Sequence, residues 1–440
     1  MRSRSETWTM MPMNFHLTFC RTRIFALAAM LALAVFTIAP AVAHATDALV
    51  YSFGTLGGTS CNNLDGADPK GSLTLANGFL FGRTSTTTGK GNGDGIIFHI
   101  DPNTLTYNID HKFTGFSTDG NSPRHNAMTL NGTVLYGTTL IGGKHDTGTI
   151  FSISDDGTGY SSPPLYDFQG AGKKNNGVMP HSCFALNGGG VLYGMTSAGG
   201  TKALPSGDGT IFSFDPQTST YTRLYSFDGA QHGSDPHGQP ILDPTGATVY
   251  GMTQTGGKHN VGVIFSFALS TSKIKVLHHF ACPNHATPTC VDKIDGATPD
   301  HGTLVESGTT LYGLTSAGGK FGVGTIFSYD LSKQKFKVLR SFGPNTTNDG
   351  LNPFGSLILN GSVLYGTTQN GGNKGKGTVF QINTDGTGYA RVHDFAGGSG
   401  DGANPIDDVI LVSGTPNMLY GMTEKGGQCN LGVIFSIALP

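Results

Sequence analysis

The sequence has few charged side chains and almost no tryptophan. Only 13% of its 440 residues are Asp, Glu, Lys or Arg, and the formal net charge is −2. A chain with little charge and a negative net charge argues against a polyanionic partner such as nucleic acid. Ala, Glu, Lys, Leu and Arg do not dominate, which excludes a coiled coil. The single tryptophan, Trp8, lies near the amino terminus, which excludes a propeller built on Trp-Asp repeats.

Glycine and aromatic residues are abundant instead. The chain contains 67 Gly, 27 Phe and 14 Tyr. The glycines have no period of three, so collagen is excluded. Disorder is excluded by the aromatic content, because a solvated chain does not keep so much apolar ring surface. This composition is typical of many short strands joined by tight turns.

The amino terminus has the pattern of a secretory signal peptide. Residues 24–39 form an apolar run after Arg21 and Arg23, and Ala43 and Ala45 form a small-residue cleavage site. We therefore expect residues 1–45 to be a signal peptide that is cleaved after Ala45. The mature protein, residues 46–440, should be secreted or periplasmic, with no membrane anchor. Removing the leader takes away four arginines and one glutamate, so the net charge moves from −2 to −5.

Three short sequence marks recur seven times along the chain. The first is aromatic-Gly-x-Thr, the second is Gly-x-Ile/Val-Phe downstream of it, and the third is Gly-x-x-Pro upstream of it. The glycines of the first mark are spaced by 53 to 62 residues, at Gly82, Gly137, Gly194, Gly251, Gly313, Gly366 and Gly421. Such a period indicates an array of repeats in a single domain.

Each repeat predicts four strands separated by turns. In the sixth copy these are residues 355–359, 363–368, 377–380 and a strand ending at Phe395, with turns at Asn360-Gly361, Gly371-Gly372 and Asp385-Gly386. Seven four-stranded units predict an all-β fold, a seven-bladed β-propeller with antiparallel blades, and a monomer. We expect the glycine of the first mark to let adjacent sheets approach closely, the Phe of the second to fill the space between blades, and the Thr to bond neighbouring backbone.

The two ends of the chain complement each other. The last copy stops after its third strand, residues 433–437, whereas residues 48–53 match the fourth strands and have no unit of their own. The amino-terminal strand is therefore expected to complete the last blade and close the ring, which removes an exposed edge.

The repeated marks resemble the GloVer tandem repeat of exported bacterial "choice-of-anchor" proteins. The resemblance rests on L-Y-G-x-T, Gly-Gly, G-T-I/V-F and the D-G-T-G-Y turn at residues 156–160 and 385–389. It covers essentially the whole mature chain and implies an exported location without implying an activity. Such proteins often carry a carboxy-terminal surface anchor, and this chain departs from them in having none.

The residues that differ between copies are the candidates for function. Histidines follow the Gly-x-x-Pro mark in copies two to five, and other polar residues accompany them. The candidate ligand-face residues are Arg124, His125, His181, His237, Asp300, His301 and Asp407. We expect these segments to begin the inner strands, so that His125, His181, His237 and His301 meet at the mouth of the central channel and, with Asp300, could bind a divalent metal.

The sequence leaves three functions open. The first is an exported binding or scaffold protein that needs no cofactor and presents a loop face to a saccharide or an envelope protein. The second is a histidine- or metal-dependent lyase or hydrolase of an acidic polysaccharide, in which His and Arg124 bind an anionic group. The third is a wet polar channel without a single task, because fold alone does not assign function.

The cysteines predict two disulfides. Cys282 and Cys290 bracket an insertion and would close it. Cys61, after the closing strand, and Cys429, in a loop of the same blade, should pair and lock the ring. Cys183 is left over and is expected to be buried and not reactive.

Overall fold

The computed structural model describes residues 47–56, 61, 64–87, 94–115, 117–170, 176–201, 207–281, 295–343 and 349–440. The signal peptide and the Cys282–Cys290 pair predicted above lie outside these residues. No helix long and apolar enough to cross a bilayer occurs in the described part of the chain. A single compact unit covers the propeller, from His44 to Pro440.

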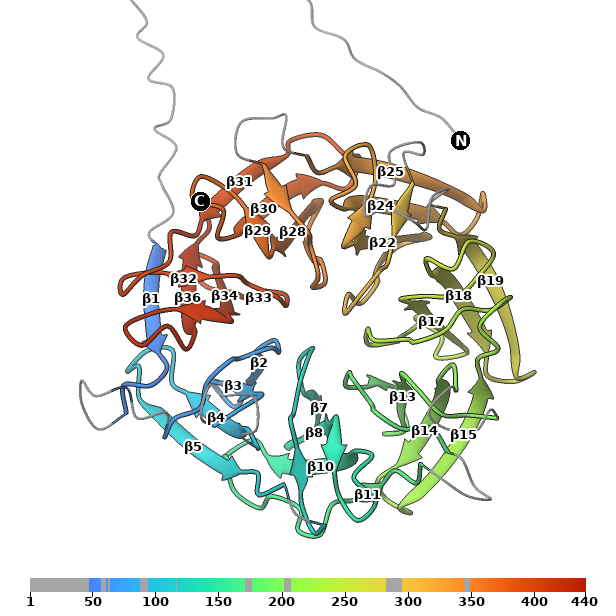
Figure 1. Cartoon of the computed structure of the whole chain (residues 1–440), viewed down its shortest axis with the longest axis horizontal. Coiled ribbons are helices and arrows are strands. Elements are labelled where there is room, and N and C mark those ends of the chain that lie inside the picture. The colour runs from blue at the N-terminus through green and yellow to red at the C-terminus, as the bar shows by residue number, and fades with distance from the viewer. Residues whose placement is uncertain are drawn as a thin grey trace, which may run out of the picture. The chain divides into compact units, whose positions relative to one another are not determined.

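Seven four-stranded antiparallel sheets form a ring, as predicted (Figure 1). The first three blades are β2 (Thr74–Ala76), β3 (Phe79–Thr84), β4 (Ile96–Ile100) and β5 (Tyr107–Lys112); β7 (Thr129–Asn131), β8 (Val134–Thr139), β10 (Thr149–Ser154) and β11 (Tyr166–Asp167); and β12 (Ala185–Leu186), β13 (Leu192–Thr196), β14 (Thr210–Asp215) and β15 (Thr220–Ser226). The next three are β16 (Ile241–Leu242), β17 (Thr248–Thr253), β18 (Val263–Ala268) and β19 (Lys273–His279); β21 (Val305–Ser307), β22 (Thr310–Thr315), β24 (Thr325–Asp330) and β25 (Lys335–Ser341); and β27 (Ile358–Asn360), β28 (Val363–Thr368), β30 (Thr378–Asn383) and β31 (Ala390–Asp394).

The seventh blade is closed by the amino-terminal strand. It consists of β33 (Ile410–Val412), β34 (Met418–Thr423), β36 (Val433–Ala438) and β1 (Asp47–Ser52). Strand β1 pairs antiparallel with β36 from Asp47 opposite Ile437 to Ser52 opposite Val433. The predicted disulfide between Cys61 and Cys429 is present beside this pairing. Cys183, the only free cysteine among the described residues, is fully buried.

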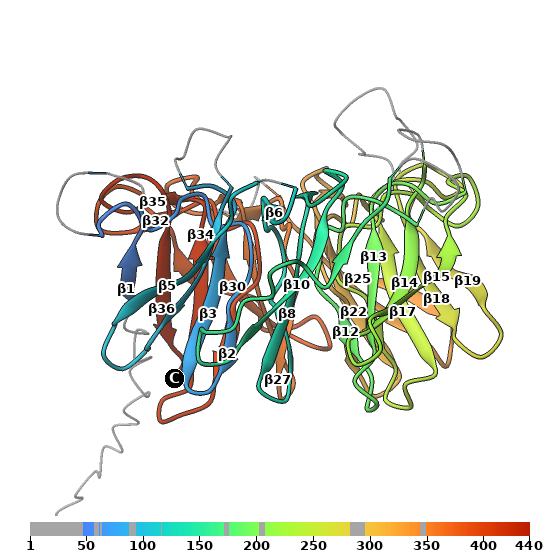
Figure 2. The ribbon, with the colours of Figure 1, turned by 90° about the horizontal axis from the view of Figure 1, so that it is seen from below.

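The loops that enter each blade and the loops between its second and third strands lie on one face. Four small two-stranded sheets join these loops. They are β6 (Gly120–Asn121) with β9 (Ile141–Gly142), β20 (Gly296–Ala297) with β23 (Ala317–Gly318), β26 (Gly350–Leu351) with β29 (Asn370–Gly371), and β32 (Gly402–Ala403) with β35 (Lys425–Gly426). The edge-on view shows β6, β32 and β35 together on this loop face (Figure 2).

The hydrophobic core is divided into seven clusters, and each lies between two neighbouring blades. Phe98 of β4, for example, packs with Phe53, Tyr420 and Ile434 of the seventh blade. The Phe of the second mark therefore fills the space between blades, as expected, and each such contact removes a large apolar ring from water.

The glycine of the first mark has a different role from the one we expected. In every blade it stands directly opposite the Phe of the neighbouring third strand, as Gly194 stands opposite Phe212. A Cβ at Gly194 would lie 2.5 Å from Cζ of Phe212, and the other six glycines have the same conflict at 2.3 to 2.6 Å. The glycine thus makes room for a ring of its own blade and does not serve the approach of adjacent sheets.

The threonine of the first mark bonds neighbouring backbone in all seven copies, as expected. Its Oγ1 donates to the carbonyl two residues further on, at 2.7 to 3.1 Å, for example from Thr315 to Ala317. This bond satisfies a carbonyl where the chain leaves the second strand towards the loop face.

Candidate functional site

The segments that follow the Gly-x-x-Pro marks run towards the ring axis before the innermost strands begin. His125 precedes β7 by four residues, so these segments do not begin the inner strands, contrary to our expectation. His125 and Asn126 have left-handed backbone, with φ of 48° and 54°, which bends the segment out of the blade. Around the axis the segments touch backbone to backbone: a Cβ on Gly238 would lie 2.2 Å from the Gly302 carbonyl oxygen.

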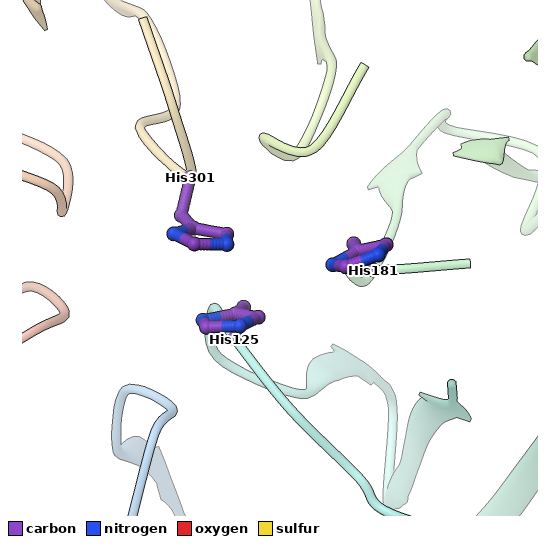
Figure 3. Close-up of side chains that lie close together, drawn as sticks. All are labelled: His125, His181 and His301. Atoms are coloured by element: carbon purple, nitrogen blue, oxygen red, sulfur yellow. The ribbon is translucent and has the colours of Figure 1, made fainter. Parts of the chain in front are cut away.

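The four predicted histidines meet on this axis. The ring centroids of His125 and His301 are 3.6 Å apart and those of His181 and His237 are 4.0 Å apart, with nearly parallel planes. One nitrogen from each of His125, His181 and His301 lies within 4.8 Å of the other two. Figure 3 shows these three rings grouped together, each carried by a different segment of the chain.

His237 is held differently from the other three. Its Nε2 lies 2.9 Å from Asp235 Oδ1, and its Nδ1 lies 3.1 Å from Asp300 Oδ1. Burial alone would lower the pKa of His237, but the hydrogen bonds to these two carboxylates outweigh it and raise the pKa to about 9. At neutral pH His237 is therefore a cation with both ring nitrogens occupied, and it has no lone pair to offer.

His125, His181 and His301 are neutral imidazoles with free ring nitrogens. Burial, reinforced by the neighbouring histidines, lowers the pKa of His125 and of His181 well below the usual value. Burial also lowers the pKa of His301, to about 4, although Asp300 opposes this shift. In each of the three rings the Nδ1 atom is buried and has no hydrogen-bond partner. Buried polar atoms without partners are rare and call for an explanation.

The backbone of the His125 segment is fixed by Arg83, which the sequence analysis missed. Its guanidinium is fully buried and donates to the carbonyl oxygens of His125 at 2.9 Å and Asn126 at 2.8 Å. It also lies 3.4 Å from the Cys183 sulfur. The available signal was that Arg83 is the only charged residue at the variable position of the seven aromatic-Gly-x-Thr marks.

The carboxylates near the histidines are engaged elsewhere. Asp300 accepts hydrogen bonds from His237 and from Gln254 Nε2, the latter at 2.9 Å. Asp407 accepts the backbone N–H of Asn126 at 2.7 Å, and its nearest histidine atom is His125 Nδ1, 4.0 Å away. Burial, together with the adjacent Asp408, raises the pKa of Asp407 well above its usual value.

A cavity of about 260 Å³ opens beside the three free histidines. Arg124, which was predicted for this face, lines it, whereas His237, Asp300 and Asp407 stand outside its wall. Residues that sequence reasoning passed over as unremarkable also line it. The wall consists of Lys70, Arg124, His125, His181, His301, Phe354, Gln369 and Ile406.

The repeat itself is diagnostic of a family. The family model described as the Gloeobacter/Verrucomicrobia repeat matches residues 92–291 and 285–440. The chain belongs to this repeat family. The resemblance found in the sequence is thus confirmed over residues 92–440. None of the curated proteins compared with this repeat protein matches it in sequence.

Solved structures similar to this repeat protein share its fold. A chain of the mitotic checkpoint complex has 11% sequence identity and a TM-score of 0.53, and the match covers 95% of this chain and 99% of that one. The extracellular domain of a one-component system from B. thetaiotaomicron has 14% identity and a TM-score of 0.51, with 84% and 38% covered. An oligogalacturonate lyase in complex with manganese has 12% identity and a TM-score of 0.49, with 82% and 86% covered. At 11% and 14% identity, the first two share only the fold with this chain.

Proposed function

We propose that this repeat protein is an exported ligand-binding propeller whose loop face carries a transition-metal centre at the mouth of the central channel. Its ligands are His125, His181 and His301. The observation that carries the proposal is the convergence of three neutral imidazoles whose buried Nδ1 atoms have no partner. Neutral imidazole is a preferred ligand of Zn²⁺ and its neighbours among divalent metals.

The geometry favours this set of ligands over a second set that shares His301. His237, Asp300 and His301 also bring their ligand atoms within 4.8 Å of one another. In that set His237 is protonated and both of its nitrogens are taken by carboxylates, so a metal would have to displace two ion pairs. In the set of His125, His181 and His301 the carboxylate contacts are longer: His301 Nδ1 lies 3.5 Å from Asp300, and His125 Nδ1 lies 4.0 Å from Asp407. Metal–nitrogen distances of about 2.0–2.1 Å require the three rings to turn their nitrogens towards one ion, and those nitrogens already lie within 4.8 Å of one another.

The test is metal binding by the purified protein and by variants with single histidine substitutions. We expect one Zn²⁺ per chain by elemental analysis and calorimetry. His125→Ala and His181→Ala should weaken binding by more than about 100-fold, since even outer-shell changes cost about 10–100-fold. The matched control is His145→Ala, because His145 is exposed on the loop face. Circular dichroism and melting temperature establish that the variants fold.

Two results would contradict the proposal. One is that the folded wild-type protein takes up no Zn²⁺, Mn²⁺ or Co²⁺ after removal of bound metal. The other is that His145→Ala reduces uptake as much as His125→Ala does.

A metal-dependent lyase or hydrolase of an acidic polysaccharide is the second candidate. One observation favours it: three protein ligands leave a coordination position open, and an open position distinguishes catalytic from structural zinc sites. Turnover of uronate-containing glycans by the metal-loaded protein, abolished in His181→Ala, would establish this activity. Binding without turnover would leave the first proposal standing alone.

A further inference from the structure

The wall of the cavity is positively charged. Among its eight residues are the cations Lys70 and Arg124, and none of the eight is an Asp or Glu. The cavity of about 260 Å³ is slightly smaller than the roughly 300–1,000 Å³ of pockets for drug-sized ligands. It therefore fits a small molecule or a single end group of a longer one.

A divalent ion on His125, His181 and His301 would keep its full charge, because all three ligands are neutral. Neither of the nearest carboxylates lines the cavity: Asp300, 3.5 Å from His301 Nδ1, is paired with the His237 cation, and Asp407, 4.0 Å from His125 Nδ1, accepts the Asn126 N–H. An uncompensated charge in a largely buried site is costly. An anion at the open coordination position removes that cost.

Arg124 is placed to hold such an anion. Its Nε donates to Ser122 Oγ at 2.7 Å, which anchors the guanidinium at the cavity wall. Among the described residues, Arg124 has no carboxylate partner. Lys70, by contrast, is paired with Asp68 at 3.1 Å and with Glu424 at 3.6 Å. The planar fork of an arginine matches the two oxygens of a carboxylate, which makes Arg124 the principal anion-binding residue of the cavity.

The remaining wall fits a carbon skeleton. Phe354 and Ile406 supply apolar surface, and Gln369 supplies an amide that can bond a hydroxyl or carbonyl group. An inorganic anion would leave the two apolar side chains without contacts, so an organic acid uses more of the wall.

We infer that the ligand of this centre is a small organic carboxylate of about the size of a sugar acid, with its carboxylate shared between the metal and Arg124. The inference rests on the proposed metal centre, because without the ion the three histidines provide no charge for the carboxylate to balance.

The experiment uses the Co²⁺-loaded protein, whose visible absorption bands report changes in metal coordination. Glucuronate and acetate are titrated as carboxylate probes, and glucose is the uncharged control. We expect both acids to shift the bands to saturation, glucuronate at the lower concentration, and glucose to leave them unchanged. Arg124→Gln should weaken glucuronate binding by at least about 10-fold, as expected for loss of hydrogen bonds to a charged group. Both proteins are titrated at saturating Co²⁺, because Arg124 lies beside the three histidines and its loss also changes their affinity for the ion.

The matched controls separate charge from geometry. Lys144→Gln removes an exposed cation of the loop face that does not line the cavity, and it should leave glucuronate binding unchanged. Arg124→Lys keeps the positive charge but lacks the planar guanidinium that donates two parallel hydrogen bonds. This variant should bind glucuronate more weakly than wild type and more tightly than Arg124→Gln.

The outcomes distinguish this inference from the proposed function. Failure to bind Co²⁺ overturns both. Co²⁺ binding with bands unmoved by either acid overturns the carboxylate inference alone. Equal binding of glucuronate by the metal-free protein, or by Arg124→Gln, also overturns it, because the carboxylate would then depend on neither the ion nor the arginine.

Discussion

At the residue scale, one glycine per blade makes room for one aromatic ring. The ring of Phe212 covers Gly194 across the strand pair, and the same pairing recurs in all seven sheets. Any side chain at this glycine would force the Phe out of the cluster between two blades. The glycine of the aromatic-Gly-x-Thr mark is therefore repeated in all seven copies because of packing. The next position varies between copies and is Arg83 in the first copy.

We predict that Gly194→Ala destabilises the protein by about 1–3 kcal/mol, the usual cost of overpacking a core. The matched control is Gly188→Ala, because Gly188 precedes the same strand and its added Cβ would meet no atom within 4 Å. Denaturant unfolding of both variants measures the difference. Equal stability of the two variants would show that the Phe ring can move aside without cost.

At the element scale, neighbouring blades are joined by stacked side chains that lie in their fourth strands or in the turns just before them. At five junctions an aromatic ring of one blade stacks on a ring or guanidinium of the preceding blade, and the loop between them supplies an Asp or Asn to the pair. The stacked pairs are Tyr51–Tyr107, His111–Tyr160, Tyr166–Tyr221, His278–Phe336 and Arg340–Tyr389. The Tyr and Phe rings of these pairs are partly buried and pack against the core clusters, so they extend the contact between adjacent blades beyond the fully buried core.

The junction between the fifth and sixth blades gives a prediction at this scale. Arg340 lies 3.5 Å from the Tyr389 ring centroid, and both donate hydrogen bonds to Asp349, at 2.8 and 2.7 Å. Tyr389→Phe keeps the stack and removes one bond to a charged group, so it should cost about 1.5–3 kcal/mol. The reference variant is Phe336→Tyr, which adds a hydroxyl group to the ring of Phe336 in the stacked pair His278–Phe336. A fall in melting temperature for Tyr389→Phe no larger than that for Phe336→Tyr would contradict the prediction.

At the scale of the whole molecule, several bonds across the closing blade hold the ring shut. Besides the β1–β36 ladder and the disulfide, Lys425 of the last blade pairs with Asp68 at the entry to the first, at 3.0 Å. His393 of the sixth blade bonds Asp47 in β1 and lies 3.4 Å from Asp401. Burial would lower the pKa of His393, but the bonds to Asp401 and Asp47 outweigh it and raise that pKa.

The raised pKa of His393 makes ring closure dependent on pH. A histidine whose pKa is higher in the folded than in the unfolded state stabilises the fold fully below the unfolded value of about 6.5. That stabilisation is lost as the pH rises through the folded pKa. The melting temperature of the wild type minus that of His393→Gln should therefore shrink between pH 6 and pH 9. A difference that stays constant or grows over this range would show that the ion pairs of His393 do not stabilise the closed ring.

The ring could be predicted from the sequence because the same three marks recur in seven copies. Repetition identified the blades, and the unmatched strand at each end identified the closure. The convergence of His125, His181 and His301 also followed from their equivalent places in the repeat. The different role of His237 did not follow from the repeat. Its positive charge depends on an ion pair with Asp235, and Asp235 belongs to a Gly-x-x-Pro mark that was interpreted as scaffold. Lys70, Phe354 and Gln369 were missed for the same reason: each is unremarkable in its own copy, and only the axis brings them together.

The three proposed metal ligands come from the second, third and fifth blades, so no single blade or adjacent pair holds them all. During synthesis the strand that closes the ring is made first and its partner β36 is made last. If synthesis stops before β36, strand β1 has no partner and the ring stays open, although all three histidines have already been made. Uptake of the ion would then register whether the two ends of the polypeptide have met, and a folding assay could follow completion of the protein through its metal.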